Sequence, residues 1–277
     1  MISGRTSLIA HLGYPTESFK APMIYNPWFE RKGIDAVVVP MGVRAEDYPA
    51  FLRLLFRISN VHGALVTMPH KAATVALLDQ ASPAVRVAGS CNAILRRDDG
   101  SLYGDMFDGE GFARGARRKG FEIAGADCLV VGAGGVGSAI AASIADRRPR
   151  LLALFDTRRD AAEALVARLR RQYADLVVEI RDNDPAGYAL VVNATPLGMR
   201  ADDPLPFDPQ RLDPRAYVGE VVLSAEMTPL LRAAAVRGCR YLVGTDMLFE
   251  QIPAYLEFLG YGAATTEELR AAARVSY

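Results

Sequence analysis

The chain has 277 residues, of which 51% are hydrophobic, and its 32 basic and 32 acidic side chains give a formal net charge of zero. This length allows one large core or two smaller ones. Zero net charge provides no overall attraction to nucleic acid or acidic membranes, and no apolar run has membrane-spanning length. The three cysteines are widely separated and the three histidines form no ligand pattern, so we expect no metal site. We expect a reduced cytoplasmic protein with no nucleic-acid or membrane partner.

The first half of the chain alternates strand-like and helical segments. Strands are expected at residues 7–11, 36–40 and 63–68, and a turn at 98–101 suggests a hairpin leading into a strand at 102–104. A helix is expected at 47–58, because its apolar residues recur at helical spacing, and another at 108–119.

The second half repeats this alternation. Strands are expected at 128–131, 151–155, 177–180, 188–193, 217–223 and 239–243, with helices at 160–171 and 229–237. The last helix is expected to begin near Thr245 and Asp246, both plausible N-caps. This alternation predicts an α/β protein with parallel sheets.

A glycine-rich run is the most informative segment. Val130 and Val131 lead into Gly132-Ala133-Gly134-Gly135-Val136-Gly137, and an alanine-rich helical segment follows. A strand, a glycine turn and a helix N-terminus together present backbone N–H groups to a pyrophosphate. The next strand ends at Asp156, where the ribose hydroxyls of a dinucleotide would bind. This context favours a nucleotide site over a purely structural glycine turn.

The position of this unit within the chain predicts two lobes. Residues 109–240 would form a Rossmann-type, doubly wound dinucleotide-binding domain. Residues 1–108 and 241–277 would form one discontinuous α/β substrate-binding and catalytic domain, with ligands bound between the lobes.

Three polar residues outside the glycine-rich run suggest redox chemistry on an alcohol. Lys71 follows a strand that stops at a proline, Asn92 follows a glycine–serine–cysteine run, and Asp108 precedes a helix. A lysine and a carboxylate can move a hydroxyl proton while hydride leaves the carbon. On residue types alone, a solvated lysine and a helix-capping aspartate fit better. His70 could tune Lys71, although a solvent-facing histidine is the simpler interpretation.

The order and spacing of several motifs resemble the shikimate/quinate dehydrogenase family over almost the whole chain. The resemblance rests on Val66–Lys71, Gly104–Gly109, Gly132–Gly137, Asn193–Met199, Thr228–Leu231 and Gly244–Gln251. It implies a two-lobed fold in which Lys71 and Asp108 form the catalytic acid–base pair.

The resemblance also implies binding residues. Those for the substrate would be Ser18, Lys20, Thr67, Asn92 and Gln251. Those for the cofactor would be Gly132, Gly134, Gly135, Val136, Gly137, Asp156, Arg158, Asn193, Thr195, Pro196, Gly244 and Met247. Several have structural alternatives: Thr67 as a strand end, Asn92 as a turn residue and Gln251 as a helix-surface residue.

Departures from the family pattern concern the substrate. Lys20 stands where we expect the second of two serines, Met106-Phe107 replaces Asn-Thr, and Leu223-Ser224-Ala225 replaces Tyr-Asn-Pro. A site with fewer hydroxyl and amide groups would make fewer hydrogen bonds to a polar ligand, so the substrate could differ from shikimate. This pattern is that of a shikimate dehydrogenase-like paralogue.

The cofactor prediction depends on Asp156 and its neighbours. NADP-using members commonly have Asn-Arg-Thr at this turn, whereas this chain has Asp156-Thr157-Arg158. A carboxylate binds ribose hydroxyls and repels a 2′-phosphate. We therefore predict NAD, with NADP as the second candidate because Arg158 and Arg159 could clamp a phosphate.

We predict an NAD(P)-dependent oxidoreductase that interconverts a ring hydroxyl and a ketone on shikimate or quinate. One alternative is the same chemistry on a related ring acid such as aminoshikimate, because Asp105 could bind an amine. A structural role of Asp105 in a turn is the simpler interpretation. The other is a non-catalytic dinucleotide-binding regulatory protein. The expected partner is a small ring carboxylic acid, and the chain is expected to be a monomer or a homodimer.

Overall fold

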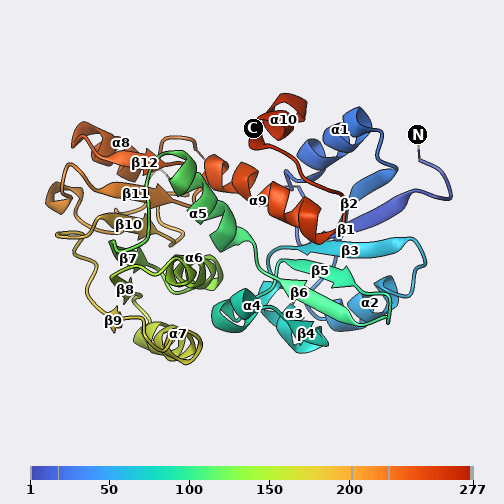
Figure 1. Cartoon of the computed structure of the whole chain (residues 1–277), viewed down its shortest axis with the longest axis horizontal. Coiled ribbons are helices and arrows are strands. Elements are labelled where there is room, and N and C mark those ends of the chain that lie inside the picture. The colour runs from blue at the N-terminus through green and yellow to red at the C-terminus, as the bar shows by residue number, and fades with distance from the viewer. Residues whose placement is uncertain (1, 18, 201, 224, 275–277) are drawn as a thin grey trace. The chain divides into compact units, whose positions relative to one another are not determined.

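The computed structural model describes residues 2–17, 19–200, 202–223 and 225–274. The chain forms two compact units (Figure 1). The first unit comprises Met1–Val85, Gly89–Phe107 and Ile252–Tyr277, and the second comprises Arg86–Ala88 and Asp108–Gln251. Within the described residues, no helix combines the length and apolar character needed to cross a membrane.

A six-stranded mixed sheet forms the centre of the first unit, with the strand order β2-β1-β3-β5-β6-β4. Its strands are β1 (Ser7–Gly13), β2 (Ala36–Gly42), β3 (Val61–Val66), β4 (Gln80–Ala81), β5 (Ala93–Arg96) and β6 (Leu102–Asp105). β1 pairs parallel with β2 and β3, whereas β5 pairs antiparallel with β3 and β6. The first sheet is therefore mixed rather than wholly parallel. The short turn containing Gly100 (φ +84°) joins β5 and β6 as the hairpin that the sequence suggested.

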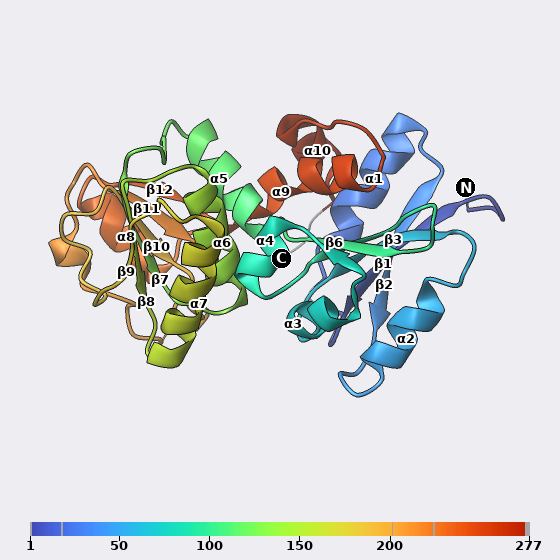
Figure 2. The same ribbon diagram turned by 60° about the horizontal axis from the view of Figure 1, so that its bottom comes forward.

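The helices of the first unit cover this sheet. They are α1 (Pro22–Lys32), α2 (Tyr48–Leu55), α3 (Lys71–Thr74), α4 (Pro83–Ala88, which ends in the second unit) and α10 (Thr266–Ala272). Figures 1 and 2 show α1 and α2 on opposite sides of the sheet, with α10 against α1. The sequence analysis did not predict α1, because Pro27 lies inside it and interrupts the helical pattern.

The second unit contains a wholly parallel six-stranded sheet in the order β12-β11-β10-β7-β8-β9. The chain enters at β7, proceeds outward through β8 and β9, and then returns to β10 on the other side. This reversal is the topological switch point of a doubly wound fold, where ligands bind at the carboxyl ends of the strands. The strands are β7 (Asp127–Val131), β8 (Leu151–Phe155), β9 (Val178–Ile180), β10 (Leu190–Asn193), β11 (Tyr217–Glu220) and β12 (Arg240–Leu242).

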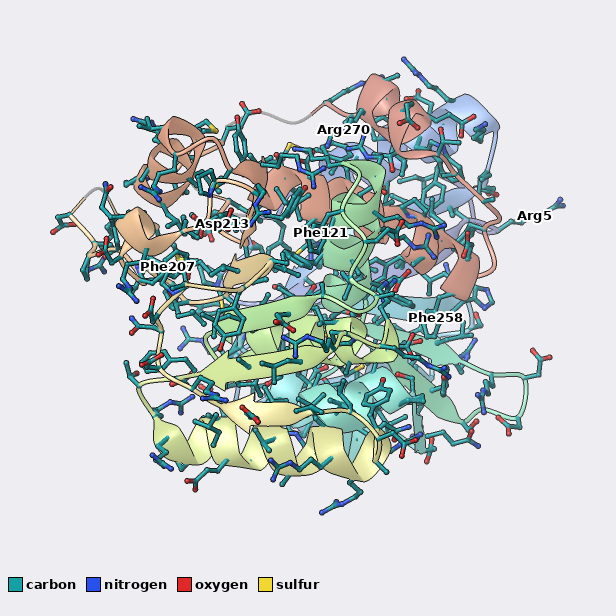
Figure 3. The ribbon with its side chains drawn as sticks, turned by 60° about the vertical axis from the view of Figure 1, so that its left-hand side comes forward. Arg5, Phe121, Phe207, Asp213, Phe258 and Arg270 are labelled. Carbon is teal, nitrogen blue, oxygen red and sulfur yellow. The ribbon has the colours of Figure 1, made fainter. Side chains whose placement is uncertain are left out.

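Helices cover both faces of the second sheet. The helices are α5 (Asp108–Arg118), α6 (Gly135–Asp146), α7 (Arg159–Gln172), α8 (Pro229–Val236) and α9 (Gly244–Phe258, which from Ile252 onward belongs to the first unit). Cys128 and Val130 of β7 face a core with α5, α6 and α7, whereas Leu129 and Val131 face a core with α8 (Figure 2). Phe121, labelled in Figure 3, extends the first core and stacks on Tyr217 with ring centroids 5.1 Å apart. The predicted α/β fold class with a Rossmann-type domain is confirmed.

Several element boundaries differ from the predictions. α2 ends at Leu55 because Arg57 and Ile58 bond to carbonyls three residues earlier, as in a turn. β3 ends at Val66 and β11 at Glu220, so residues predicted as strand belong to loops that carry candidate site residues. α9 begins at Gly244, before the expected N-caps.

Candidate active site

Backbone hydrogen bonds bring Thr67, Lys71 and Asn92 together in the first unit. Lys71 is the first residue of α3, and its carbonyl accepts a hydrogen bond from Cys91 N at 2.8 Å. Val66 N donates to Asn92 O at 2.8 Å, and Thr67 N donates to Leu12 O at 2.8 Å. The end of β3, the start of α3 and the Asn92 turn therefore form one junction.

Asn92 also holds the segment that leads to Asp108. It is fully buried, and its Oδ1 accepts a hydrogen bond from Phe107 N at 2.9 Å. Its own N–H donates to Asp105 O at 3.0 Å, and the Tyr255 hydroxyl donates to Asn92 O at 3.4 Å. The structure thus gives Asn92 the role of a turn residue, and its predicted substrate contact would be an additional role.

A neutral histidine lies near the Lys71 charge. His11 of β1 is buried, and burial, followed by the charge of Lys71, lowers its pKa to about 4. Its ring stacks on Phe19 with centroids 4.1 Å apart. The sequence analysis missed this pair, although a histidine within an otherwise apolar strand is a signal for it. Cys91 remains a thiol at neutral pH, since burial raises its pKa to about 12.

Other polar residues of the first unit are engaged within the fold. His70 is buried, contrary to the solvent-facing interpretation, because Nε2 hydrogen-bonds to Val43 O at 2.8 Å and its ring stacks on Tyr48. Asp105 Oδ1 accepts from Ser82 Oγ at 2.5 Å and from Met106 N at 2.7 Å, which fits its turn interpretation. Lys20 lies half-buried just before α1, and Ser18 is outside the described residues.

The glycine turn of the second unit has the geometry that a dinucleotide requires. Gly132 adopts φ +108°, which favours glycine, and a Cβ there would lie 2.8 Å from Ala194 O. Gly134 is the N-cap of α6 and faces open space, since no atom lies within 4 Å of an added Cβ. A Cβ on Gly137 would collide with Gly132 O. These are the tight turn, the open approach for a pyrophosphate and the close helix packing of this fold.

The first turn of α6 completes this anion site. Gly135 and Val136 are its first residues, and backbone N–H groups of a first helical turn lack partners within the helix. Helix N-termini with such free N–H groups bind phosphate in other proteins. The residues present therefore fit a dinucleotide.

Asp156 lies directly beside the glycine turn. Its Oδ2 accepts a hydrogen bond from Ala133 N at 2.7 Å, and its Oδ1 accepts from Arg158 N at 2.8 Å. The Arg158 side chain is 69% exposed, with its Nε 4.0 Å from Asp156 Oδ1. Arg159 pairs with Glu163 along α7 at 2.9 Å. The charged side chain held directly against the glycine turn is therefore the carboxylate of Asp156, and not either arginine.

The loop after β10 folds back on itself. Asn193 is fully buried, and its Nδ2 donates to Leu197 O at 3.0 Å. Its Oδ1 accepts from Thr195 N at 3.1 Å and from Thr195 Oγ1 at 2.6 Å. Pro196 lies within this closed turn, and Ala194 lies against Gly132. The loop that holds Asn193, Thr195 and Pro196 therefore adjoins the glycine turn through Ala194 and Thr195.

Asp108 opens a helix that is packed tightly on two sides. A Cβ on Gly109 would collide with Ala139 O of α6, and one on Gly111 would lie 2.7 Å from Gln251 Cβ of α9. Asp108 itself is buried, with 5% of its surface exposed. The two glycines thus place Asp108 where α5 meets both the dinucleotide helix α6 and α9.

α9 carries the remaining candidates. Gly244 is its first residue, and Met247 and Gln251 are both buried. Gln251 Oε1 is buried and has no hydrogen-bond partner among the described residues. A buried amide oxygen is costly unless a ligand or water donates to it, which suits contact with a substrate hydroxyl.

The sequence analysis missed Glu220, the last residue of β11. Its Oε1 accepts from Asn193 Nδ2 at 2.5 Å, and its Oε2 accepts from Thr228 Oγ1 at 2.6 Å. Burial raises its pKa to about 7, while these two hydrogen bonds lower it. An acidic residue at the end of an otherwise apolar parallel strand is the sequence signal that would have identified it.

Comparison with known proteins identifies the family. Residues 12–94 match the family model described as the shikimate dehydrogenase substrate binding domain. A shikimate dehydrogenase (NADP(+)) of Rubrobacter xylanophilus is 38% identical over 256 residues, which cover 90% of this chain and 89% of that protein. The chain belongs to the shikimate dehydrogenase family. The predicted family membership and oxidoreductase class are thereby confirmed.

Other relatives agree over nearly the whole length. A shikimate dehydrogenase (NADP(+)) of Acidiphilium cryptum is 34% identical and covers 94% of this chain and 93% of that protein. Shikimate 5-dehydrogenase of Listeria monocytogenes, solved with shikimate and NAD, has a TM-score of 0.90 at 26% identity, covering 98% of this chain and 97% of that chain. Quinate dehydrogenase of Corynebacterium glutamicum, solved with NAD, has a TM-score of 0.86 at 28% identity, covering 96% and 98%. The two solved structures hold NAD and the two curated relatives are named for NADP(+), so both cofactors of the prediction occur among these proteins.

Proposed function

We propose that this chain oxidises a ring hydroxyl of a shikimate- or quinate-like acid to a ketone, with Lys71 and Asp108 as the acid–base pair. The observation that carries the proposal is the junction at Asn92. The neighbouring Cys91 N donates to the carbonyl of Lys71, and the Asn92 side chain accepts from Phe107 N, next to Asp108. Two adjacent buried residues thus hold the chain at or beside both proposed catalytic positions.

The proposed chemistry divides among the side chains. A hydroxyl must lose its proton as hydride leaves the carbon, and an ammonium with a carboxylate can hold and pass that proton. Thr67, Asn92 and Gln251 would hydrogen-bond the ring hydroxyls. Lys20 and Ser18 would bind the carboxylate, Lys20 as a point charge on a long side chain. The nicotinamide dinucleotide, when bound, supplies the hydride acceptor.

The family departures bear on which ring acid is the substrate. Phe107 packs edge-on against Tyr255 and Phe258, with centroids 4.9 and 5.4 Å away, so its ring belongs to the core of the first unit. Asp105 is hydrogen-bonded to Ser82 and to Met106 N, which weakens the argument for an amine-bearing substrate. Shikimate and quinate therefore remain the leading candidates, with aminoshikimate as the alternative.

Asp156 supports NAD as the preferred cofactor. Its carboxylate is held beside the glycine turn, where a 2′-phosphate would meet like charge. Arg159 is paired with Glu163, which leaves the exposed Arg158 as the nearer cation for a phosphate. The curated relatives are named for NADP(+), so this preference would set the chain apart from them.

The experiment that tests the proposal is formation of reduced nicotinamide by the purified protein. Shikimate and quinate are each combined with NAD and with NADP over a range of concentrations, with aminoshikimate as the third substrate. We expect saturable turnover with shikimate or quinate, and higher efficiency with NAD. Bound cofactor without turnover on any of the three would contradict the proposal and favour a dinucleotide-binding regulatory protein.

A further inference from the structure

The carboxyl group at the end of β11 has no part in the chemistry described above. Glu220 is fully buried, and its register partner in the parallel sheet is Asn193 at the end of β10. Both residues therefore lie at the carboxyl edge of the sheet, where this fold binds ligands. A buried ionisable group costs free energy unless hydrogen bonds compensate it, so its contacts indicate its role.

Glu220 connects two elements that are far apart in the sequence. One carboxyl oxygen accepts from Asn193 Nδ2, and the other accepts from the Thr228 hydroxyl. Thr228 is the N-cap of α8, and its Oγ1 accepts from Leu231 N at 3.2 Å. Because that oxygen is an acceptor for the helix, its proton is available for Glu220. The carboxyl group thus ties the end of β10 to the beginning of α8.

This tie fixes the orientation of the Asn193 amide. With Nδ2 donating to both Glu220 and Leu197 O, the amide cannot turn over without losing two bonds. Its Oδ1 must then face Thr195, whose N–H and hydroxyl both donate to it. Thr195 Oγ1 in turn accepts from Leu197 N at 3.1 Å, which closes the turn.

The far end of the same loop also lies beside this tie. Gly198 adopts φ +101°, and a Cβ there would lie 3.8 Å from Thr228 Cβ. The segment Asn193–Met199 therefore contacts Glu220 at its first residue and lies beside Thr228 near its other end. The segment contains the predicted cofactor residues Asn193, Thr195 and Pro196, and the resemblance to shikimate/quinate dehydrogenases implies that it lines the nicotinamide.

We propose that Glu220 is a positioning residue for the nicotinamide, acting through Asn193 and Thr228 to fix the loop Asn193–Met199. The inference rests on the proposed function, because it assumes that this loop contacts the nicotinamide. Two donors face Glu220, so a carboxylate satisfies both. A glutamine would present its NH₂ to one of these donors and lose that contact.

Binding of the whole cofactor is compared with binding of a fragment that lacks the nicotinamide. The comparison distinguishes positioning of the nicotinamide from a general effect of Glu220 on the stability of the fold. NADH contains the nicotinamide, whereas ADP-ribose keeps the pyrophosphate and both riboses but lacks it. The dissociation constants of both are measured by calorimetry for the wild type, Glu220→Ala, Glu220→Gln and the surface control Glu122→Ala. If the wild type prefers the phosphorylated cofactor, NADPH and 2′-phospho-ADP-ribose replace the pair.

We expect Glu220→Ala to weaken NADH binding about tenfold and ADP-ribose binding less than twofold, with Glu220→Gln about threefold weaker for NADH only. Glu122→Ala should bind both as the wild type does. If Glu220→Ala does not fold, the Glu220→Gln comparison decides. Equal weakening of both ligands, or of neither, overturns the inference. A wild type that binds neither ligand instead overturns the proposed function, and this inference with it.

Discussion

The two units hold their own candidate residues in different ways. In the second unit the cofactor part is largely backbone: a glycine turn at φ +108°, an open N-cap at Gly134 and the first turn of α6. In the first unit the candidate residues are side chains on loops of a mixed sheet, tied by hydrogen bonds around Asn92. A site built from backbone groups at glycines tolerates few substitutions. A site built from side chains can bind a different ligand after a single substitution.

This contrast explains where the chain departs from its family. The glycine positions keep the family spacing: a side chain at Gly132 or Gly137 would clash with the backbone, and Gly134 leaves open space for a ligand. The departures at Lys20, Met106 and Phe107 lie in the side-chain part of the first unit. Those at Asp156, Thr157 and Leu223 lie in the second unit, outside the glycine turn itself. Four predictions test the contrast, from the largest expected effect to the smallest.

The largest effect is expected from Lys71→Ala. Loss of the ammonium should lower kcat by about 10³-fold, at the scale of a lost acid–base group, while NADH binding stays within twofold. Steady-state kinetics and calorimetry measure the two quantities. Lys32→Ala removes an exposed lysine of the same unit, paired with Glu268, and serves as the control. Turnover of Lys71→Ala within tenfold of the wild type would contradict the assigned role.

The second prediction separates two glycines of one motif. Gly137→Ala should destabilise the protein by about 2 kcal/mol and weaken NADH binding more than tenfold, because its Cβ would meet Gly132 O. Gly134→Ala has free space in the unbound protein, so its stability should change by less than about 0.5 kcal/mol while NADH binding still weakens. Denaturant unfolding and calorimetry measure the two. Equal loss of stability in both variants would contradict the distinction.

The third prediction concerns the cofactor. Asp156→Asn combined with Thr157→Arg removes the carboxylate beside the glycine turn and adds a cation, so the NADP-to-NAD ratio of kcat/KM should rise about tenfold or more. Steady-state kinetics with both cofactors gives the ratio. Arg159→Ala, whose side chain pairs with Glu163, should change the ratio by less than twofold. An unchanged ratio in the double variant would refute the ribose placement.

The smallest effect is a pH dependence of stability. The folded-state pKa of Glu220 is about 7, above the 4.5 of an unperturbed glutamate, so the folded protein binds the proton more tightly. Binding of this proton therefore stabilises the folded state relative to the unfolded chain. That stabilisation is fully present below pH 4.5 and is lost as pH rises through 7. Between those values the stability of the wild type should fall relative to Glu220→Gln by about 2 kcal/mol. Urea unfolding from pH 4.5 to 8 measures this. A parallel pH profile for the two proteins, with Glu122→Gln as the control, would contradict it.

The sequence predicted the second unit better than the first. Strict alternation of strands and helices, with the glycine run after a strand, leaves few possible topologies, and the parallel sheet follows. In the first unit the turn at 98–101 predicted the hairpin, but the antiparallel pairing of β5 with β3 does not follow from local patterns. The helix α1 was missed because it contains a proline.

Candidate residues within motifs could be found from the sequence, but their partners could not. The interactions of Glu220 with Asn193 and Thr228 and of His11 with Phe19 join residues that lie apart in the chain. Local patterns do not encode such pairings. The burial of His70 was missed for the same reason, because Val43 and Tyr48 enclose it from another loop and helix.

The most direct test of the central claim follows the hydrogen itself. Shikimate carrying deuterium at the ring carbon whose hydroxyl is oxidised is incubated with the protein and NAD, and the reduced cofactor is analysed by mass spectrometry. We predict one deuterium in the reduced nicotinamide, which should form about 10³-fold more slowly when Lys71→Ala replaces the wild type. Reduced cofactor without label, or no reduction with either shikimate or quinate, would contradict oxidation of a ring hydroxyl by hydride transfer.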